Sequence, residues 1–483
     1  MTSAIEGLKP ELVWKYFAEI SKIPRGSKNE TAIINYVLET AKKLGLEAKK
    51  DRIGNVAVTK PASSGKENVP TVVLQGHLDM VCEKNKDKIH DFTRDPIELI
   101  REGNIIRANG TTLGADNGIG VAISLAIMED KSLVHGPLEF LFTVDEETGL
   151  TGAQNLQSDF LKGKILINLD SEEEGALYVG CSGGQDTIGT LSIEWENAPE
   201  DYSAFTISIT GLRGGHSGLD INAGRANALK LLNRVLWNLN EKLDLRISKF
   251  EGGSKRNAIP REAEAVICIP KDKSAFVKSE IQNFQNLFAM EYAKVDSGVK
   301  LTITETSKSK VLKKNDSNKL LNLLYSLPHG VVAMSADIPN LVETSTNLAI
   351  INFNENNIVI ATSQRSSVES CKKDIVYQVS SVFRLAGAKV ENTDGYPGWK
   401  PNLNSKILSI SKEIYKKLFG KEPEIKAIHA GLECGIIGEK FPGMDMISMG
   451  PTLEAVHSPD EKIYIDTVEK FWKYLLEILK NIN

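Results

Sequence analysis

The sequence predicts a mixed α/β fold with a second, α+β domain inserted into it. Between residues 47 and 186, short apolar segments rich in β-branched residues alternate with helical segments, as in a largely parallel sheet with flanking helices. From about residue 187 the strand-like segments instead alternate apolar and polar positions, which is typical of antiparallel strands with one solvated face. The length of 483 residues also exceeds what one simple core supports.

The first strong helix signal is "SKNETAIINYVLETAKKLG", residues 27–45. Ser27 and Glu30 have the spacing of a capping box, apolar residues follow at helical spacing, and Gly45 marks the end. We therefore expect a helix whose N-terminus is capped by these two side chains.

Four buried strands and one helix are expected next. The segments "NVAVT" (55–59), "TVVLQ" (71–75), "LEFLFTV" (138–144) and "KILINLD" (164–170) are short and mostly apolar, as strands buried on both faces should be. Between them "NGIGVAISLAIMED" (117–130) predicts a helix, which completes a β–α–β rhythm.

The inserted segment has a different pattern. Residues 204–215, 262–270 and 348–366 alternate in hydrophobicity, and a helical stretch at 224–243 lies between them. Gly and Pro cluster near 394–401, where the insert is expected to end. The predicted organisation is therefore a discontinuous domain of residues 1–186 and 396–483, with residues 187–395 inserted.

Composition excludes several classes of protein. The net charge of −5 argues against nucleic acid or an anionic membrane as the main partner. No apolar stretch is long enough for a membrane span, and the N-terminal residues lack the pattern of a signal peptide. Five scattered cysteines without a CxxC pair suggest neither a disulfide framework nor a thiolate metal site, so a cytoplasmic location is expected.

Polar residues suited to metal binding follow the predicted strands. They are His77, Asp116, Glu147, Asp170 and His457. The carboxyl ends of strands in an open α/β sheet are where ligands bind, so these side chains could converge. Two imidazoles and three carboxylates are ligands that divalent ions such as zinc accept, and they suffice for two ions if the short Asp116 side chain bridges them.

Two neighbouring carboxylates extend this hypothesis. Asp79 is two residues from His77, so on extended backbone it faces the same way and can orient the imidazole. Glu146 precedes Glu147, and on extended backbone the two would point apart, leaving Glu146 free to act as a general base. Taken singly, each residue has a plainer interpretation as a surface, loop or turn residue.

Several motifs carry a family resemblance over nearly the whole chain. In order, "GHLD", "GADNGIG", "DEETG", "NLDSEEEG" and "VHSPDE" resemble the di-zinc exopeptidase family of carboxypeptidases, aminoacylases and related dipeptidases. The stretches "LQGHLDMVCEKN", "HDFTRDPI", "ANGTTLGADNGIG", "GLRGGHSGLDIN", "RNAIPREA" and "HAGLECG" resemble its aminoacyl-histidine dipeptidase branch, also called cytosol non-specific dipeptidases.

The resemblance implies a role for each candidate residue. His77 and Asp170 would hold one zinc ion, and Glu147 and His457 the other, with Asp116 bridging the two in each subunit; Co²⁺ or Mn²⁺ could replace zinc.

The same resemblance makes Glu146 the general base for a water that bridges the two ions, and Asp79 the residue that orients His77. It implies a cis peptide bond after Asp116 and makes His216 a stabiliser of the oxyanion.

Substrate contacts are expected at Asn257, His429 and Glu433. Arg256 and Arg261 could bind a carboxylate, although solvated arginines are more common.

The expected function is metal-dependent hydrolysis of dipeptides, of the Xaa-His type with broad specificity, in a catalytic domain covered by a lid domain. The open alternatives are a tripeptidase, an N-acyl amino acid amidohydrolase and a non-catalytic metal-binding protein. A dinucleotide-binding oxidoreductase is disfavoured because no GxGxxG follows the first strand. The resemblance also implies a homodimer, because in family members where the histidine equivalent to His216 lies this early in the insert it reaches the active site of a partner subunit.

Overall fold

The computed structural model describes residues 3–483 and divides them into two compact units. Among the described residues, the first unit contains residues 3–181, 399–427 and 432–483, and the second contains residues 182–398 and 428–431. The division lies close to the boundaries expected at 186 and 396. One short segment, 428–431, belongs to the second unit although the sequence analysis placed it in the first. Among the described helices, none combines the length and apolar character needed to cross a membrane.

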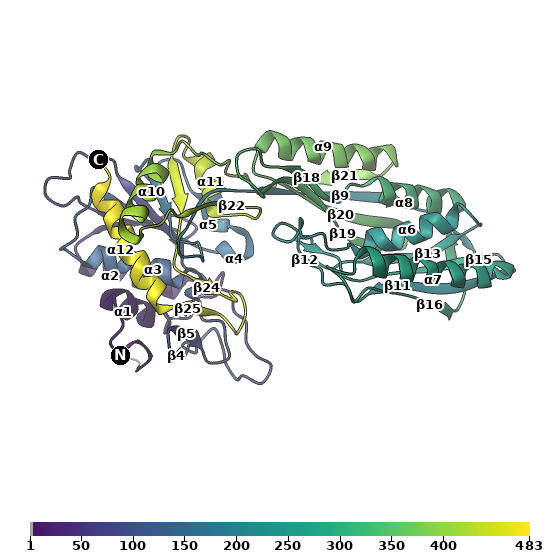
Figure 1. The fold of residues 1–483 in the computed structure, drawn as a ribbon, viewed down its shortest axis with the longest axis horizontal. Helices are drawn as coiled ribbons and strands as arrows, with labels where there is room; N and C mark the ends of the chain where they lie inside the picture. The colour runs from purple at the N-terminus through teal and green to yellow at the C-terminus, as the bar shows by residue number, and fades with distance from the viewer. Residues whose placement is uncertain (1–2) are drawn as a thin grey trace. The chain divides into compact units, whose positions relative to one another are not determined.

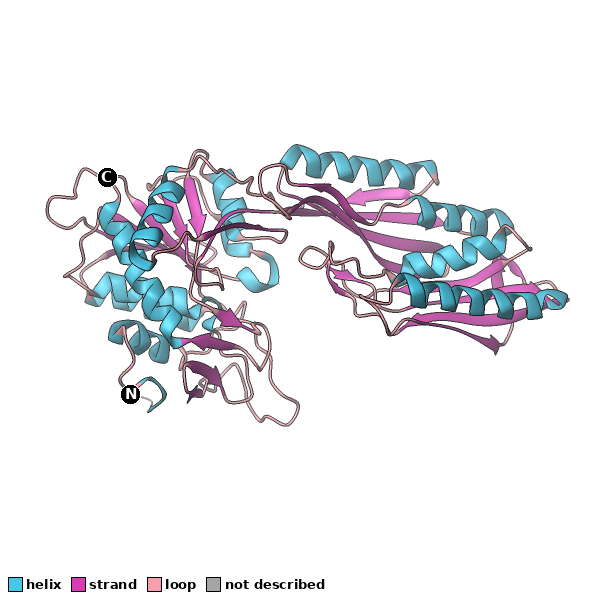
Figure 2. Ribbon diagram, in the orientation of Figure 1, coloured by secondary structure: helices cyan, strands magenta, loops and turns pink. Residues whose placement is uncertain are grey.

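The first unit is built on an eight-stranded sheet (Figures 1 and 2). Across the sheet the strands are β1 (Glu47–Lys50), β2 (Val56–Lys60), β6 (Leu138–Thr143), β3 (Val72–His77), β7 (Ile165–Asn168), β23 (Asp445–Ser448), β8 (Ala176–Cys181) and β22 (Glu424–Ile428). The four central strands β6, β3, β7 and β23 are parallel, whereas β1, β2 and β8 pair antiparallel with their neighbours. This mixed, largely parallel core confirms the predicted α/β class.

The register of the central strands places their carboxyl ends together. His77 pairs with Thr143, and Gln75 with Asn168, so residues that follow these positions emerge at one edge of the sheet. Every residue of β3 and β6 is buried, as expected for strands covered on both faces. The polar loops that follow β3 and β6 therefore begin where these fully buried strands end.

Helices flank this sheet (Figure 1). They are α1 (Glu11–Ile20), α2 (Thr31–Lys43), α3 (Ala115–Glu129), α4 (Glu146–Gly149), α5 (Thr151–Asn155), α10 (Lys406–Phe419), α11 (Glu433–Lys440) and α12 (Ile465–Asn481), after a short 3₁₀ turn η1 (Ser3–Ile5). A separate small sheet has the order β24 (Leu453–Glu454), β25 (Lys462–Tyr464), β5 (Ile105–Ala108) and β4 (Leu99–Glu102). Helix α3 packs on both α1 and β3, so its N-terminal residues lie near the end of β3.

The predicted capping box of α2 is wrong. The helix starts at Thr31, and Glu30 makes no side-chain cap. The Ser27 hydroxyl instead donates to Asp79 Oδ2 at 2.8 Å, and Glu30 Oε1 accepts from the backbone N–H of Asp145 at 3.0 Å. Ser27 thus bonds a distant carboxylate, and Glu30 Oε1 accepts both from Asp145 and from the backbone N–H of Lys28 at 2.8 Å. The helix end at Gly45 (φ 74°) agrees with the prediction.

The second unit is an antiparallel sheet with four helices. The strand order is β16 (Lys300–Thr306), β11 (Tyr202–Thr210), β15 (Ala263–Pro270), β13 (Arg246–Gly252), β19 (Val342–Phe353), β20 (Asn357–Ser366), β9 (Gly183–Ser192) and β21 (Lys389–Asn392), and β18 (Gly330–Met334) also pairs with β19. The helices are α6 (Ala228–Asn240), α7 (Ser274–Glu291), α8 (Lys314–Ser326) and α9 (Glu369–Leu385), with a 3₁₀ turn η2 (Lys271–Lys273). Their apolar faces and the sheet form one buried cluster, which is the predicted α+β arrangement.

Two short ribbons complete this unit. They are β10 (Trp195–Asn197) with β17 (Lys310–Leu312), and β12 (Gly215–His216) with β14 (Ala258–Ile259). The second ribbon pairs His216 with Ala258, which places the imidazole next to the Asn257 segment.

Candidate active site

The candidate metal ligands of the first unit all lie at or just beyond element ends. His77 is the last residue of β3, Glu147 lies in α4 directly after β6, and Asp170 follows β7. Asp116 is in the first turn of α3, and His457 is in the loop between β24 and β25. The parallel register described above brings the ends of β3, β6 and β7 side by side.

Asp116 lies between the two histidines. Its Oδ1 is 3.1 Å from His77 Nε2, and its Oδ2 is 3.1 Å from His457 Nε2. His77 Nε2 is also 3.3 Å from Asp170 Oδ1, and His457 Nε2 is 3.1 Å from Glu147 Oε2. Two groups of three ligands therefore share the Asp116 carboxylate, one oxygen facing each group, and the ligand atoms within each group lie within 4.8 Å of one another.

This donor set fits divalent cations. Glu147 Oε1 and Asp170 Oδ1 are buried without a hydrogen-bond partner, and within residues 3–483 neither these carboxylates nor Asp116 pairs with a lysine or arginine. Buried carboxylates normally require a cation or hydrogen bonds. Imidazole and carboxylate together suit zinc and similar ions.

The pKa shifts show the same excess of negative charge. Hydrogen bonds that His457 donates to the Asp116 and Glu147 carboxylates raise the pKa of His457 to about 11. Burial lowers the pKa of His77, but Asp170 and Asp116 outweigh it, so that this pKa is raised well above its ordinary value. Burial raises the pKa of Asp170 to about 7. The cluster therefore attracts positive charge, either as protons or as metal ions.

Asp79 joins several parts of this cluster. Its Oδ1 is 3.3 Å from His77 Nδ1. The same carboxylate accepts the backbone N–H of Glu146 at 3.1 Å and that of Glu147 at 3.2 Å, besides the Ser27 hydroxyl. Burial raises the pKa of Asp79, but the hydrogen bond and charge of His77 outweigh it and bring it to about 2. Asp79 is therefore ionised and can hold both the imidazole and the Glu146–Glu147 backbone.

The expectation that Glu146 and Glu147 lie on extended backbone is wrong. Both lie in the short helix α4, which follows Asp145 in the left-handed region (φ 50°). Successive helical residues point about 100° apart, so the two carboxylates still diverge. Burial, together with the charges of Asp170 and Glu433, raises the pKa of Glu146 well above its ordinary value. The expected cis peptide bond between Asp116 and Asn117 is present.

Glu433 lies beneath the ligand-bearing strand ends. It is 0% exposed, and its Oε2 accepts from Gln75 Nε2 at 2.6 Å and from the Thr143 hydroxyl at 2.7 Å. Gln75 Oε1 in turn accepts from Asn168 Nδ2 at 2.6 Å. Burial raises the pKa of Glu433 to about 7. This side chain therefore links β3, β6 and, through Gln75, β7.

The second unit holds His216 in a defined hydrogen-bonding state. Its Nδ1 accepts the backbone N–H groups of Gly218 at 3.2 Å and Leu219 at 3.1 Å. Burial and the nearby charge of Arg365 lower the pKa of His216 to about 4. The ring is therefore neutral at pH 7, and with Nδ1 accepting, the proton is on Nε2, which is a hydrogen-bond donor.

His429 lies in the same unit. Its Nε2 is 2.7 Å from the Ser345 hydroxyl, and its backbone oxygen is so close to Gly218 that a Cβ there would lie 2.0 Å from it. Burial, Arg365 and His216 lower the pKa of His429 to about 3. His216 and His429 are therefore both neutral next to the charge of Arg365.

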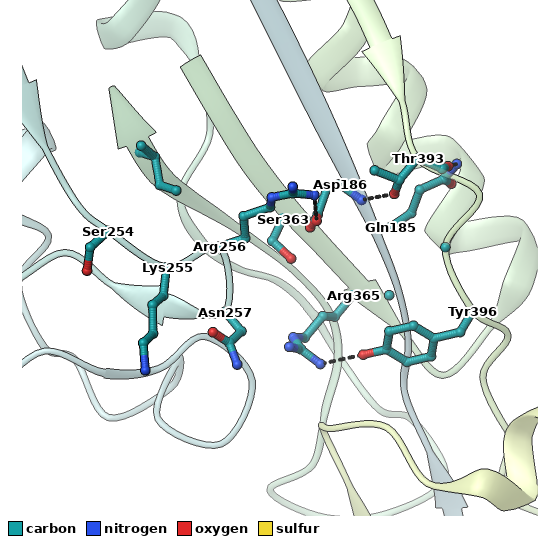
Figure 3. A pocket seen from close by; sticks show the side chains of 13 residues that line it. Gln185, Asp186, Ser254, Lys255, Arg256, Asn257, Ser363, Arg365, Thr393 and Tyr396 are labelled. Carbon is teal, nitrogen blue, oxygen red and sulfur yellow. Dashed lines mark hydrogen bonds and ion pairs between the residues drawn. The ribbon is translucent and has the colours of Figure 1, made fainter. Parts of the chain in front are cut away.

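A cavity of about 690 Å³ opens beside Arg365 (Figure 3). Asn257 and Arg256 also line it, and Arg256 pairs with Asp186 at 3.1 Å. Arg365 is only 6% exposed, and it donates to two neutral groups, the Tyr396 hydroxyl at 2.8 Å and the Ser217 hydroxyl at 3.4 Å. Within the described chain no carboxylate forms an ion pair with Arg365, so its charge is available to an anion.

The sequence analysis considered Arg256 and Arg261 as carboxylate-binding residues but missed Arg365. The available signal was its position. Arg365 lies inside the apolar–polar alternation of residues 348–366, where a buried cation is unusual. A charged residue inside a predicted strand is therefore the sequence signal of this buried cation.

Comparisons with known proteins agree with this architecture. Residues 73–481 match the family described as Peptidase family M20/M25/M40. The chain is 44% identical over 483 residues to the cytosol non-specific dipeptidase of Escherichia coli (strain K12), with 99% of each chain covered. It is similar to the crystal structure of aminoacylhistidine dipeptidase from Vibrio alginolyticus, with a TM-score of 0.92, 42% identity, and 100% and 99% of the two chains covered.

A more distant likeness concerns the fold alone. Aminopeptidase PepT from Bacillus cereus ATCC 10987 has a TM-score of 0.58 at 17% identity, over 98% of this chain and 99% of the other. The family match spans most of the chain, and a close relative covers nearly all of it. The chain therefore belongs to peptidase family M20/M25/M40 and is a peptidase, as its motifs predicted.

Proposed function

We propose that this peptidase is a metal-dependent dipeptidase that hydrolyses Xaa-His and other dipeptides using two divalent ions, zinc foremost. The observation that carries the proposal is the Asp116 carboxylate, whose two oxygens face two separate ligand groups beside an additional carboxylate, Glu146. The names of the relatives from Escherichia coli and Vibrio alginolyticus support a dipeptide substrate.

Five residues would hold the metal ions. His77 and Asp170 would form one group, Glu147 and His457 the other, and Asp116 would belong to both. When bound, the two ions would activate a water molecule and polarise the peptide carbonyl. Asp79, which lies beside His77 Nδ1, would keep Nε2 directed at the first group.

Glu146 would move the proton. It is not part of an ion pair within the described residues, and its raised pKa makes it a stronger base than an exposed glutamate. We assign to its carboxylate the proton of the attacking water and then the protonation of the leaving amine nitrogen. His216 Nε2–H, fixed by the bonds at Nδ1, would donate to the oxyanion that forms at the carbonyl.

Arg365 would recognise the free carboxylate of the substrate. It is a buried cation in a cavity of suitable size, and Asn257 lines the same cavity. His429, which is neutral beside Arg365, would contribute a polar surface without adding charge. Glu433 would support the strand ends through Gln75 and Thr143, and its Oε1, which has no hydrogen-bond partner among the described residues, would be the atom that contacts the substrate.

A homodimer in the cytoplasm remains part of the proposal. Strand β18 pairs only with β19 among the described strands, and it exposes Val331, Val332 and Met334. An exposed apolar edge strand favours association with a second strand. Sedimentation of the purified protein tests this directly, because a monomer at micromolar concentration would contradict it.

The test of the function is amino acid release from four substrates, Ala-His, Gly-Gly, Leu-Gly-Gly and N-acetyl-methionine, with zinc and with chelator. We expect chelator-sensitive cleavage of the two dipeptides alone, and weaker cleavage of Ala-His carboxamide, which lacks the anion for Arg365. Cleavage of the tripeptide or of the acylated substrate would move the specificity to those classes. A metal-loaded protein that cleaves none of them would be a metal-binding protein without this activity.

A further inference from the structure

Two buried charged side chains hold the loop that leads to Asp116. Glu461 is 2% exposed and Arg25 is 3% exposed, and neither belongs to the ligand groups described above. Both bond the backbone of residues 113–116. Their hydrogen bonds go to backbone groups, and the charge of Glu461 also acts on Arg25. Buried charges of this kind require a structural or functional reason.

Glu461 accepts four backbone N–H groups. Oε2 accepts from Leu113 at 2.7 Å and Gly114 at 2.9 Å, and Oε1 accepts from Ala115 at 2.8 Å and Asp116 at 3.2 Å. Three of them, from Gly114, Ala115 and Asp116, are among the N–H groups left without helical partners at the start of α3, and Leu113 directly precedes its N-cap. A carboxylate is the best acceptor for them, because its charge strengthens each bond and complements the helix dipole.

Arg25 binds the same loop through its carbonyl groups. It donates through Nη2 to Gly114 O and through Nη1 to Leu78 O at 3.0 Å and Asp79 O at 2.8 Å. A Cβ at Gly114, where φ is 68°, or at Gly118 would lie 2.6 Å from Nη2. Arg25 therefore joins the turn after His77 to the loop before Asp116, and the glycines provide the space for it.

Glu461 also ends the loop that carries His457. The Glu461 N–H donates to Ser458 O at 3.1 Å, and the Ser458 hydroxyl donates to Ala455 O at 2.7 Å. His457 itself is 51% exposed and has a φ of 61°, a left-handed conformation that non-glycine residues hold only when their surroundings impose it. The buried Glu461 carboxylate is the anchor of this exposed loop.

The opposite ligand group is held differently. His77 is buried at the end of a central strand, and Asp170 directly follows another. These two residues depend on the sheet and on Asp79, whereas His457 depends on a loop. The two groups should therefore respond unequally to loss of the loop anchor.

We propose that Glu461 is a positioning residue that ties the His457 loop to the Asp116 loop and so controls the metal held by Asp116, Glu147 and His457. Loss of the Glu461 carboxylate selectively lowers the affinity for this metal ion. The affinity for the ion held by His77, Asp116 and Asp170 stays near its wild-type value. The inference rests on the proposed two-metal centre. It adds that the metal affinities of the two sites depend to different extents on one buried carboxylate, that of Glu461.

The test is the Glu461→Gln variant. Its side-chain NH2 group would replace one carboxylate oxygen and face two backbone N–H groups, so that those two hydrogen bonds are lost. Zinc is titrated into metal-free protein in competition with a chromophoric chelator, which reports the number and affinity of sites without any enzyme assay. We expect wild type to bind two ions, and the variant to retain one at near wild-type affinity while the other weakens about 10- to 100-fold.

Glu139→Gln is the matched control. Glu139 is 4% exposed, and its carboxylate accepts the backbone N–H groups of Lys162 at 2.9 Å and Gly163 at 2.8 Å, away from the ligands. This variant should lose thermal stability but keep both zinc affinities. If Glu139→Gln also bound zinc more weakly at the site of Asp116, Glu147 and His457, the loss of affinity would reflect general destabilisation and the proposal would fail.

A second variant, Glu461→Asp, covers the case in which the amide does not fold. It keeps the charge but is one methylene shorter, so we expect a smaller selective weakening of the same site. Unchanged affinities at both sites, or equal loss at both, would overturn the proposal. Wild type that does not bind two ions would instead contradict the proposed function.

Discussion

The histidines of the two candidate clusters, one in each unit, have opposite pKa shifts. In the first unit, carboxylates raise the pKa of His457 to about 11 and that of His77 well above its ordinary value. In the second unit, burial and Arg365 lower the pKa of His216 to about 4 and that of His429 to about 3. The same side chain is thus placed among anions in one unit and beside a cation in the other.

This contrast separates two chemical tasks. A cluster that attracts positive charge is suited to metal ions, and a neutral, polar cluster beside a buried arginine is suited to an anionic group. Hydrolysis of a dipeptide needs both, because the carbonyl must be activated and the terminal carboxylate recognised. The predictions below alter one unit at a time.

The largest effect is expected in the first unit. Glu146→Gln removes the proposed base and should lower kcat by about 10² to 10⁴, while zinc stoichiometry stays at the wild-type value. Steady-state kinetics and metal analysis on one preparation provide the measurement. A variant with near-normal turnover would remove Glu146 from the mechanism.

In the second unit, His216→Ala removes the proposed donor to the oxyanion. We expect kcat to fall about 10²- to 10³-fold with little change in KM, because the bond forms mainly in the transition state. A rise in KM at constant kcat would instead assign His216 to ground-state binding.

Arg365→Met tests the anion site. Loss of a charged hydrogen bond, worth about 1.5–3 kcal/mol, should raise KM for Ala-His about 10- to 100-fold and have little effect on Ala-His carboxamide. Arg256→Met is the control, since Arg256 is exposed and already paired with Asp186. Equal losses on both substrates would argue against carboxylate recognition.

A smaller, pH-dependent effect is expected on stability. His429 stays neutral in the folded protein down to about pH 3, whereas the unfolded chain takes up its proton near pH 6.5. The stability that wild type has above pH 6.5 is therefore lost progressively as the pH falls towards the folded pKa. The stability difference between wild type and His429→Gln in urea unfolding of metal-free protein should shrink between pH 7.5 and 4.5. A constant difference would contradict the lowered pKa.

The smallest effect is expected for Ser27→Ala. It removes one hydroxyl donor to Asp79 and should cost about 1 kcal/mol of stability, with a modest loss of kcat. If Ser27 instead capped α2, the variant would be less stable but would keep its kcat. That result would support the capping box, which the contacts of Ser27 contradict.

The sequence predicted the strands and the gathering of the candidate ligands at the strand ends, because both depend on local pattern. A buried strand such as 71–75 is visible as an apolar run, and the polar residues after it mark the sheet edge. Ser27 and Glu30 were misassigned because their actual partners, Asp79 and Asp145, are distant in sequence. Arg25 bonds the carbonyl groups of Asp79 and Gly114, and Arg365 bonds the Tyr396 hydroxyl. These partners are distant in sequence, so no local pattern identifies them.

The path of the chain between the units limits how the protein can be taken apart. It passes from one unit to the other at 181/182, 398/399, 427/428 and 431/432. A gene fragment for residues 182–398 therefore encodes the cavity and Arg365 but lacks His429, which belongs to the same unit and bonds Ser345. Exchange of this fragment between relatives would combine Arg365 from one protein with His429 from the other. The exchanged fragment would then have to pack against the four residues 428–431 of its new host.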